Sequence, residues 1–455
     1  MSTSSDVRSP SQIGFPPEEF AARRAKALDA IGGEALALVQ GAPAVRGFEV
    51  FRQSNEFHYL CGVEVPHSYL LLDGRSRKAT LFLPDPLLIQ ASSEGDSLAG
   101  QAPEAVVKLT GVDEVRRADA LSGMLKGART LYVPHSPAEG RAVSRDEALR
   151  GNRIAASDPW DGEIPREARF IGLLRARHPS VEIRDLSPIL DRLRMLKTPR
   201  EMELLRRAGR LTGLGLMEAA RSTRPGVFEY QLAAVANFVF LANGARGEGY
   251  RAIAASGPNI WFSHYFRNDC PLKDGDLVLF DYAPDYGYYT SDIGRMWPVN
   301  GRFGPLQREL YGFVVEYHKA LLTRIRPGVL ASQIMAEAAA EMSDAVARTR
   351  FSKPIYEAAA RRLLEFKGHL SHPIGMAVHD VGSYQAEPLA PGLVITVDPQ
   401  MWVPEEKLYI RVEDSVVVTD SGIENLTGFV PLELDETEAL VGKRGILQAH
   451  SSIWL

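Results

Sequence analysis

The sequence predicts an α+β protein of two domains, and three observations lead to this fold class. Short apolar and β-branched runs alternate with helical patterns over about the first 185 residues, which is typical of an α/β domain. After this point the chain becomes helix-rich and basic. Two later segments have the pattern strand, turn, strand, and similar residues precede both of them, which indicates a duplicated unit.

The composition narrows the classes of protein that fit. The net charge of the 455 residues is −5, so we expect no basic surface for nucleic acid. Two cysteines, Cys61 and Cys270, are too few for a disulfide framework and favour a reducing compartment. The start of the chain lacks signal-peptide features, and no apolar run approaches the roughly 20 residues that span a bilayer. We therefore expect a soluble cytoplasmic protein that binds neither nucleic acid nor membrane.

The elements of the first domain can be followed in order. The Ser-rich residues 1–14 are expected to be mobile. A helix opened by proline is predicted over 16–31. The apolar run "ALALVQ" (35–40) follows it, and strands are then predicted for "YLLLDG" (69–74), "ATLFLPD" (79–85) and "TLYVP" (130–134). The polar residues 136–168 indicate an insertion or a long connection, and the domain is expected to span 15–185.

The second domain, expected over 186–455, opens with a helix-rich stretch at 185–221 and contains a weak internal repeat. "RPGV" occurs at 224–227 and at 326–329, and a helical pattern follows it each time. "GDLVLFD" (275–281) and "GLVITVD" (392–398) both end in an aspartate six residues after a glycine. Two matches in the same order make a duplicated unit a reasonable hypothesis.

Each repeat carries a hairpin with an acid pair. In a simple hairpin over 275–299, Asp281 and Asp292 would lie opposite each other, with Cβ atoms about 5 Å apart. Two like charges at that distance repel unless a cation lies between them. The second hairpin, over 392–419, pairs Asp398 with Glu413 in the same way, and Arg411 alternates onto the face of Glu413.

Three histidines gather in "HLSHPIGMAVHDVG", residues 369–382. A single acid or histidine is usually an ordinary surface or core residue, but four paired acids beside a histidine cluster favour a metal site. Carboxylates with one or two imidazoles suit Mn²⁺, Co²⁺, Fe²⁺ or Zn²⁺, and the lack of thiolates excludes a Cys-type zinc site. Two ions with bridging carboxylates would generate hydroxide near neutral pH and stabilise an oxyanion.

The order of these motifs resembles a known family. "SGPNIWFSHY", "GDLVLFDYAPDYGYYTSDIGRMWP", "SHPIGMAVHDVG", "VITVDPQ" and "YIRVEDSVVVT" follow one another as in the pita-bread metallopeptidases, specifically Xaa-Pro aminopeptidases and prolidases, over about 190–430. Residues 51–74 resemble the start of the family's smaller N-terminal domain. The resemblance implies a C-terminal pita-bread domain with a pseudo-two-fold repeat, a creatinase-like α/β domain before it, a small peptide substrate and a homodimer or larger homo-oligomer.

The resemblance also implies a dinuclear site with five ligands. By position, Asp281 and Asp292 would hold one ion, and His372 with Asp398 the other. Asp292 and Glu413 would bridge the two. The implied ions are Mn²⁺, Co²⁺ or Zn²⁺.

Three further residues match catalytic positions of the family. His264 and His379 match substrate-facing histidines that hold the substrate carbonyl and help to stabilise the tetrahedral intermediate. Arg411 matches an arginine that supports the site or the substrate. His369 has no assigned role, because the family often has His-Gly where this chain has Gly-His.

The chain departs from the family near these ligands. The family has Glu-Pro-Gly where Asp398, Pro399 and Gln400 stand, and that Glu both binds metal and accepts a proton. Gly294 and Met296 replace two hydroxyl residues close to Asp292. Loss of such supporting contacts can weaken metal binding roughly 10–100-fold. We therefore expect a divergent branch whose second ion binds more weakly.

These observations predict a metal-dependent exopeptidase that hydrolyses the bond before proline, like an aminopeptidase P or a prolidase. Asp398 would also act as proton acceptor in this reaction. Two alternatives stay open: another reaction on the same fold, namely C–N hydrolysis or a lyase reaction, and a non-catalytic peptide-binding module. Metal-free relatives and binding modules lose most ligands, whereas all five positions here keep ligand-competent side chains.

Overall fold

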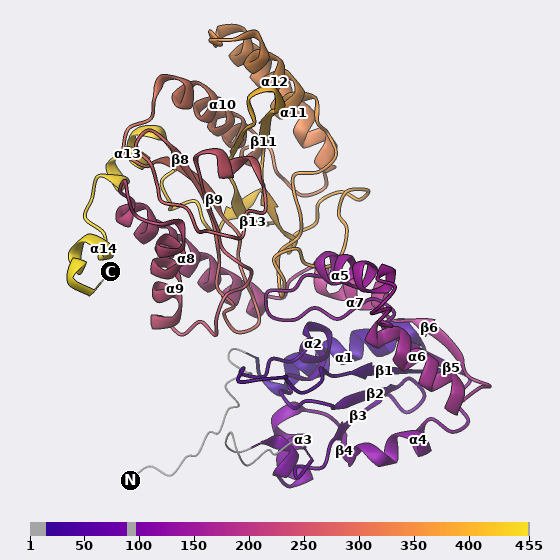
Figure 1. The fold of residues 1–455 in the computed structure, drawn as a ribbon. Helices are drawn as coiled ribbons and strands as arrows, with labels where there is room; N and C mark the ends of the chain where they lie inside the picture. Colours follow the sequence, from indigo (N-terminus) through magenta and orange to yellow (C-terminus); the bar gives the residue numbers. More distant parts are fainter. Residues whose placement is uncertain (1–14, 89–96, 454–455) are drawn as a thin grey trace, which may run out of the picture. The chain divides into compact units, whose positions relative to one another are not determined.

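The computed structural model of the protein describes residues 15–88 and 97–453. The segment 1–14, expected to be mobile, lies outside the described residues. The chain divides into two compact units, the first ending at Arg194 and the second beginning at Met195, and each is described by itself (Figure 1). The assignment of 15–185 and 186–455 to the two domains remains a prediction.

The first unit is built on one six-stranded sheet of order β4-β3-β2-β1-β5-β6. β1, β2 and β3 pair antiparallel, and the outer pairs are parallel. The strands are β1 (Ala35–Gln40), β2 (Tyr69–Asp73), β3 (Lys78–Leu83), β4 (Glu114–Arg117), β5 (Thr130–Val133) and β6 (Glu182–Asp185). The three predicted strands are therefore confirmed, and the apolar run 35–40 also forms a strand; β1, β2 and β3 are buried over most of their length, and β5 at alternate positions.

Helices pack against this sheet (Figure 1). α1 (Pro17–Ile31) begins directly after Pro16, as the proline predicts. Ile171 and Leu174 of α6 share a core with Leu36 and Leu38 of β1. The other helices are α2 (Asn55–Cys61), α3 (Pro103–Thr110), α4 (Leu121–Met124), α5 (Arg145–Ser157), α6 (Arg166–Arg177) and α7 (Ser187–Met195).

The expectation of a long connection at 136–168 is wrong in part, because α5 occupies its centre. This helix has no buried residue. Its largest apolar side chains, Leu149 and Ile154, are exposed, so the helix adds nothing to the core of the unit.

A buried network of charged residues lies within the first unit. The guanidinium of Arg145 contacts the carboxyls of Glu56 at 2.8 Å, Glu139 at 2.9 Å and Asp191 at 2.6 Å. Arg194 contacts Glu139 at 2.7 Å. Three carboxyls thus face two guanidiniums. Burial and the charge of Glu139 raise the pKa of Glu56 to about 8, so this carboxyl keeps its proton at neutral pH.

The second unit contains three small sheets covered by helices. One sheet is β7-β8-β9, another is β10-β13-β14, and β11 pairs with β12. Their bounds are β7 (Ile253–Ser256), β8 (Leu277–Asp281), β9 (Gly294–Pro298), β10 (Val394–Val397), β11 (Gln400–Val403), β12 (Leu408–Arg411), β13 (Asp414–Val418) and β14 (Ile423–Asn425). An isolated bridge between Gly294 and Glu413 joins the first two sheets.

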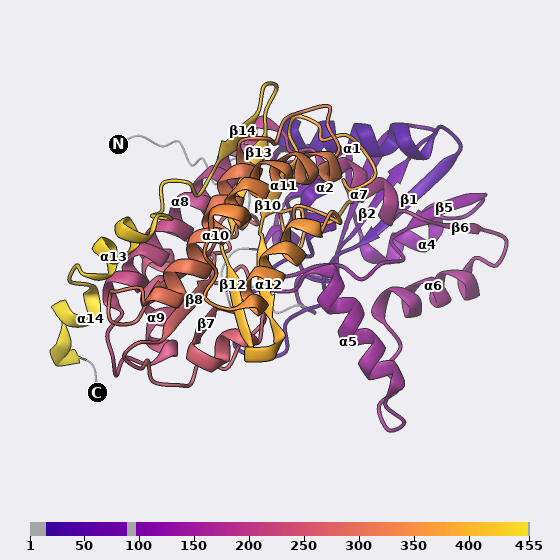
Figure 2. The ribbon, with the colours of Figure 1, turned by 90° about the horizontal axis from the view of Figure 1, so that it is seen from above.

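Two groups of helices pack on these strands. α8 and α9 pack against each other, and α10, α11 and α12 form a second layer over β11 and β12 (Figure 2). Thr198 and Glu201 cap the start of α8 reciprocally. The helices are α8 (Pro199–Ser222), α9 (Glu229–Ala242), α10 (Pro305–Leu322), α11 (Ala331–Arg348), α12 (Pro354–Glu365), α13 (Leu434–Val441) and α14 (Ile446–Ala449).

The predicted repeat is visible in the backbone. Gly226 of the first "RPGV" has φ of 89°, and its amide donates to the carbonyl of Leu272 at 2.9 Å. Gly328 of the second has φ of 78° and donates to the carbonyl of Leu389 at 2.8 Å. Both acceptors stand three residues before the glycine of the matching strand motif. Positive φ explains why glycine recurs at both turns.

One of the two predicted hairpin registers is wrong. Asp281 pairs with Gly294, so Asp292 lies two residues before the expected position. The segment between β8 and β9 is a long buried loop with its own bridges, which a simple turn does not describe. In the second hairpin, Val397 pairs with Asp414 and Gln400 with Arg411, which is the predicted register.

Candidate metal centre

Three of the five predicted ligands converge. One ligand atom from each of Asp292, His372 and Glu413 lies within 4.8 Å of the others. His372 Nε2 is 3.4 Å from Asp292 Oδ2 and 3.9 Å from Glu413 Oε1. The local cause is the bridge between the two sheets, where the Glu413 amide donates to the Gly294 carbonyl at 2.9 Å. His372 arrives from the loop that follows α12.

Asp281, at the end of β8, is linked to Asp292 through Tyr250 and also contacts Arg411. The hydroxyl of Tyr250 lies 2.5 Å from Asp281 Oδ1 and 2.8 Å from Asp292 Oδ1. Arg411 donates from Nη2 to Asp281 Oδ2. Sequence reasoning missed Tyr250, because its role depends on contacts 31 and 42 residues away along the chain.

The two aspartates have very different electrostatics. Burial, together with the charge of Asp292, raises the pKa of Asp281 to about 7. Burial also acts to raise the pKa of Asp292, but the hydrogen bond and charge of His372 outweigh it and lower this pKa to about 2. Asp292 is therefore an anion at neutral pH, as a metal ligand must be.

Asp398 is not part of the trio. Its side chain is 3% exposed, and Oδ2 accepts a hydrogen bond from Gln400 Nε2 at 2.5 Å. Oδ1 lies 3.8 Å from Arg411 Nε and finds no hydrogen-bond partner among the described residues. Both side-chain oxygens of Glu413 are likewise buried without a hydrogen-bond partner in the described part of the chain.

Buried carboxylate oxygens without partners are costly, and a divalent cation would compensate for that cost. The donor set of carboxylates and one imidazole suits Mn²⁺, Co²⁺, Fe²⁺ or Zn²⁺. The residues present therefore fit the metal that the sequence predicts.

The histidines separate into two environments. The rings of His372 and His379 have centroids 4.3 Å apart, and His264 lies 6.1 Å from His379. His379 thus adjoins both His372 and His264. His369 instead packs edge-on against Phe366, with centroids 5.0 Å apart.

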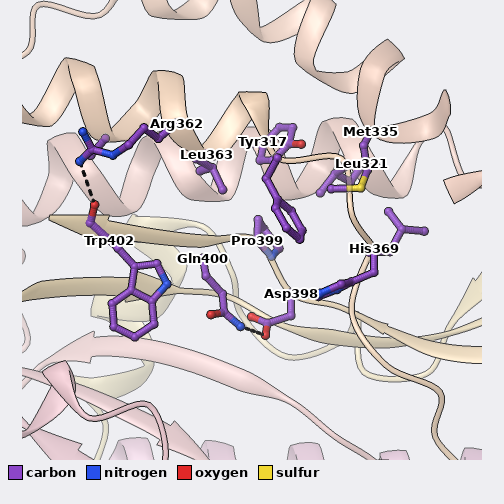
Figure 3. A pocket seen from close by; sticks show the side chains of 13 residues that line it. Tyr317, Leu321, Met335, Arg362, Leu363, His369, Asp398, Pro399, Gln400 and Trp402 are labelled. Atoms are coloured by element: carbon purple, nitrogen blue, oxygen red, sulfur yellow. Dashed lines mark hydrogen bonds between the residues drawn. The ribbon is translucent and has the colours of Figure 1, made fainter. Parts of the chain in front are cut away.

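A cavity of about 420 Å³ lies beside Asp398 (Figure 3). It lies among residues of α10, α11, α12 and β11, and His369 belongs to its wall. Asp398 and Gln400 face each other across its floor. Most of the remaining wall is apolar: Tyr317, Leu321, Met335, Ala359, Leu363, Phe366, Leu370, Pro399 and Trp402.

The loop that carries the histidines is held by a buried ion pair. Lys197 Nζ is 3.1 Å from Asp380 Oδ2, and both side chains are 1% exposed. The Asp380 amide donates to the Pro373 carbonyl at 3.0 Å. A methyl group at Gly375 would clash with the Asp380 carboxylate, so glycine is required there. The sequence analysis did not predict the ion pair between Lys197 and Asp380.

A second convergent group, formed by Glu229, Asp269 and Cys270, has a structural explanation. The buried Glu229 carboxylate accepts hydrogen bonds from Ser256, from Asn259 and from the Cys270 amide. Its oxygens are thus already satisfied.

Sequence profiles of two known families match this chain. The profile of metallopeptidase family M24 matches residues 203–420, and that of the aminopeptidase P N-terminal domain matches residues 20–132. Among the described residues, none of the helices has the length and apolar character needed to cross a membrane.

Curated proteins and solved structures resemble the chain over nearly its whole length. It is 32% identical to a Xaa-Pro aminopeptidase of Escherichia coli, over 93% of this chain and 97% of that protein. A Xaa-Pro dipeptidase of Homo sapiens is 28% identical, over 86% and 84%. Proline aminopeptidase P II from Yersinia pestis superposes with a TM-score of 0.77 at 30% identity, over 94% and 99%. Zinc-substituted Escherichia coli aminopeptidase P with product gives 0.76 at 29% identity, over 94% and 98%.

Proposed function

Because the chain belongs to metallopeptidase family M24, we propose that it is an exopeptidase that hydrolyses the peptide bond before proline. It is a metallohydrolase with the α+β pita-bread fold and the N-terminal domain of aminopeptidase P. The observation that carries the proposal is the convergence of Asp292, His372 and Glu413, with both Glu413 oxygens buried and without a hydrogen-bond partner among the described residues.

We assign five metal ligands: Asp281, Asp292, His372, Asp398 and Glu413. Bound divalent ions would supply Lewis acidity and a water of lowered pKa. Their number and identity belong to the proposal: two ions of Mn²⁺, Co²⁺ or Zn²⁺, the second of them weaker. A homo-oligomer and a cytoplasmic location, both expected from the sequence, also remain proposals.

Other residues of the chain orient the reactants. Tyr250 restrains Asp281 and Asp292 through its hydroxyl. His264 and His379 stand beyond His372, where they would hold the scissile carbonyl and stabilise the charge that develops on its oxygen. We assign to Asp398 the acceptance of the proton from the attacking water.

Arg411 supports the carboxylates. It contacts Asp281, lies 3.6 Å from Glu413 and 3.8 Å from Asp398. A guanidinium among three buried carboxylates reduces their mutual repulsion, and we infer that it keeps them in ligand orientation.

The test is hydrolysis of peptides by the purified full chain with Mn²⁺, Co²⁺ or Zn²⁺. We expect cleavage of Ala-Pro-Ala or Ala-Pro, and far slower cleavage of Ala-Ala-Ala. A preference for the tripeptide would identify an aminopeptidase, and a preference for the dipeptide a dipeptidase. Chelator and Glu413→Gln should abolish turnover, whereas Glu357→Gln, at an exposed residue of α12, should not. Intact peptides under every metal, or cleavage that survives chelation, would contradict the proposal.

A further inference from the structure

We propose that Gln400 is a positioning residue that holds the Asp398 carboxylate in ligand orientation. This inference rests on the proposed metal site and goes beyond it, because it adds a residue that binds neither metal nor substrate. It also explains how a ligand with the short reach of aspartate can serve at this position.

The two carboxylate oxygens of Asp398 differ in their hydrogen bonding. Gln400 Nε2 donates to Oδ2 at 2.5 Å, whereas Oδ1 has no hydrogen-bond partner among the described residues. Hydrogen bonds to an ionised carboxylate are among the stronger ones in proteins, and this side chain is only 3% exposed. One oxygen is thus fixed and the other stays available for an ion.

Gln400 is itself well placed to act as a fixed point. It begins β11, and the ladder pairs it with Arg411 on β12. Pro399 restricts the backbone between the two side chains. Its donor position is therefore set by the strand rather than by the metal.

The neighbouring cavity makes such a restraint necessary. Asp398 and Gln400 line the cavity of about 420 Å³, which leaves room for the carboxylate to turn (Figure 3). Without the donor, Oδ2 would lose the partner that opposes this movement. The same room means that a side chain longer by one methylene would fit at 398 once the side chain at 400 is shortened.

The two positions are therefore predicted to be coupled. Asp398→Glu alone moves the carboxylate toward the space of the Gln400 amide, and shortening Gln400 alone frees the carboxylate. In the double variant, the shorter side chain at 400 leaves space for the longer acid, and the longer acid no longer depends on the Gln400 amide. Such non-additivity is the signature of residues that act as a unit.

The experiment is calorimetric titration of the metal-free full chain with Mn²⁺. Gln400→Met keeps the volume of the side chain but removes the donor, and we expect it to weaken Mn²⁺ binding at the step that uses Asp398 by about 10-fold or more. Gln400→Ala should do the same. Asp398→Glu/Gln400→Ala should recover most of that loss, and excess Mn²⁺ should restore turnover of Gln400→Met.

Gln333→Ala, on α11, serves as the matched control and should bind Mn²⁺ like the native protein. Urea unfolding of each metal-free variant shows whether it folds. Native affinity in both Gln400→Met and Gln400→Ala would overturn the inference while the proposed function stands. The inference would also be overturned if Gln400→Met lost Mn²⁺ affinity and the double variant Asp398→Glu/Gln400→Ala did not recover it. If the native chain binds no Mn²⁺, Co²⁺ or Zn²⁺, the proposed function itself fails, and this inference fails with it.

Discussion

At the scale of single residues, three histidine rings of the site neighbour one another, and His372 contacts two carboxylates of the candidate site. His372 is close enough to Asp292 and Glu413 for one cation to contact all three side chains. The ring of His379 lies 4.3 Å from that of His372, and the ring of His264 lies 6.1 Å from that of His379. We therefore expect substitution of His372 to affect metal binding, and substitution of His379 or His264 to affect catalysis.

We expect His372→Ala to lose bound metal, because it removes one of three convergent ligands. His379→Ala and His264→Ala should keep the metal while kcat falls about 100-fold or more. His369→Ala should change neither quantity. Metal content by mass spectrometry and steady-state kinetics measure the two effects. If His369→Ala lost metal and His372→Ala kept it, the assignment of ligands would be wrong.

The convergence of Asp292, His372 and Glu413 could be anticipated from the sequence, because all three stand in ordered motifs. Their partners could not be named in this way. Tyr250, Lys197 and Gln400 carry no motif of their own, and Lys197 meets Asp380 across 183 residues. Contacts of this kind depend on the packed fold, so a pattern of residue types does not reveal them.

At the scale of elements, the loop of residues 369–382 is attached through Asp380 to Lys197, which stands two residues before α8. Lys197→Met should lower the free energy of unfolding by about 3–5 kcal/mol, because it leaves a buried carboxylate without its cation. Urea denaturation checks this. Lys319→Met, which removes an exposed ion pair with Glu433, should cost less than about 1 kcal/mol. Equal losses in the two variants would contradict the structural role of the buried pair.

Whether an element could be predicted depended on how its apolar residues are arranged. β1, β2 and β3 are mostly buried and β5 is buried at alternate positions, and all four were recognised as apolar or β-like runs. The edge strands β4 and β6 read "EVRR" and "EIRD", and they were missed because charged residues protect sheet edges. The first hairpin was recognised, but its register was not, because a long loop separates its strands.

At the scale of the whole molecule, the first unit carries a charge network that should make stability depend on pH. The pKa of Glu56 is about 8 in the folded protein, whereas the ordinary pKa of a glutamate, which applies in the unfolded chain, is 4.5. Between these values the folded state holds a proton that the unfolded chain has released, so the Glu56 contribution to stability falls as pH rises. Glu56→Gln cannot lose that proton.

We therefore expect Glu56→Gln to gain stability relative to the native protein as pH rises from about 5 to about 9. Urea midpoints at three pH values measure the difference. Glu147→Gln, at an exposed residue of α5, should show a constant difference. A gap between Glu56→Gln and the native protein that narrows with rising pH would contradict the assignment.

Metal should stabilise the second unit selectively, because all proposed ligands belong to it. Mn²⁺ at 100 times its Kd should contribute about 2.7 kcal/mol. Hydrogen exchange should then slow about 100-fold in the slowest amides of β8, β9, β10 and β13, and stay unchanged in β1, β2 and β3. Glu413→Gln should show no such protection. Equal slowing in both units, or none, would contradict a site confined to the second.

The matching turns at Gly226 and Gly328 mark the duplicated unit, and this duplication affects how the residues of the proposed metal centre can change during evolution. Asp281 and Asp292 come from one copy of the duplicated unit, and Asp398 and Glu413 from the other. In a pair of identical half-length chains, a substitution in one acid would appear on both sides of the centre at once. Fusion into a single chain removes that constraint. One copy can therefore change a proposed ligand and its neighbour, here Asp398 and Gln400, while the other copy keeps its proposed ligands unchanged.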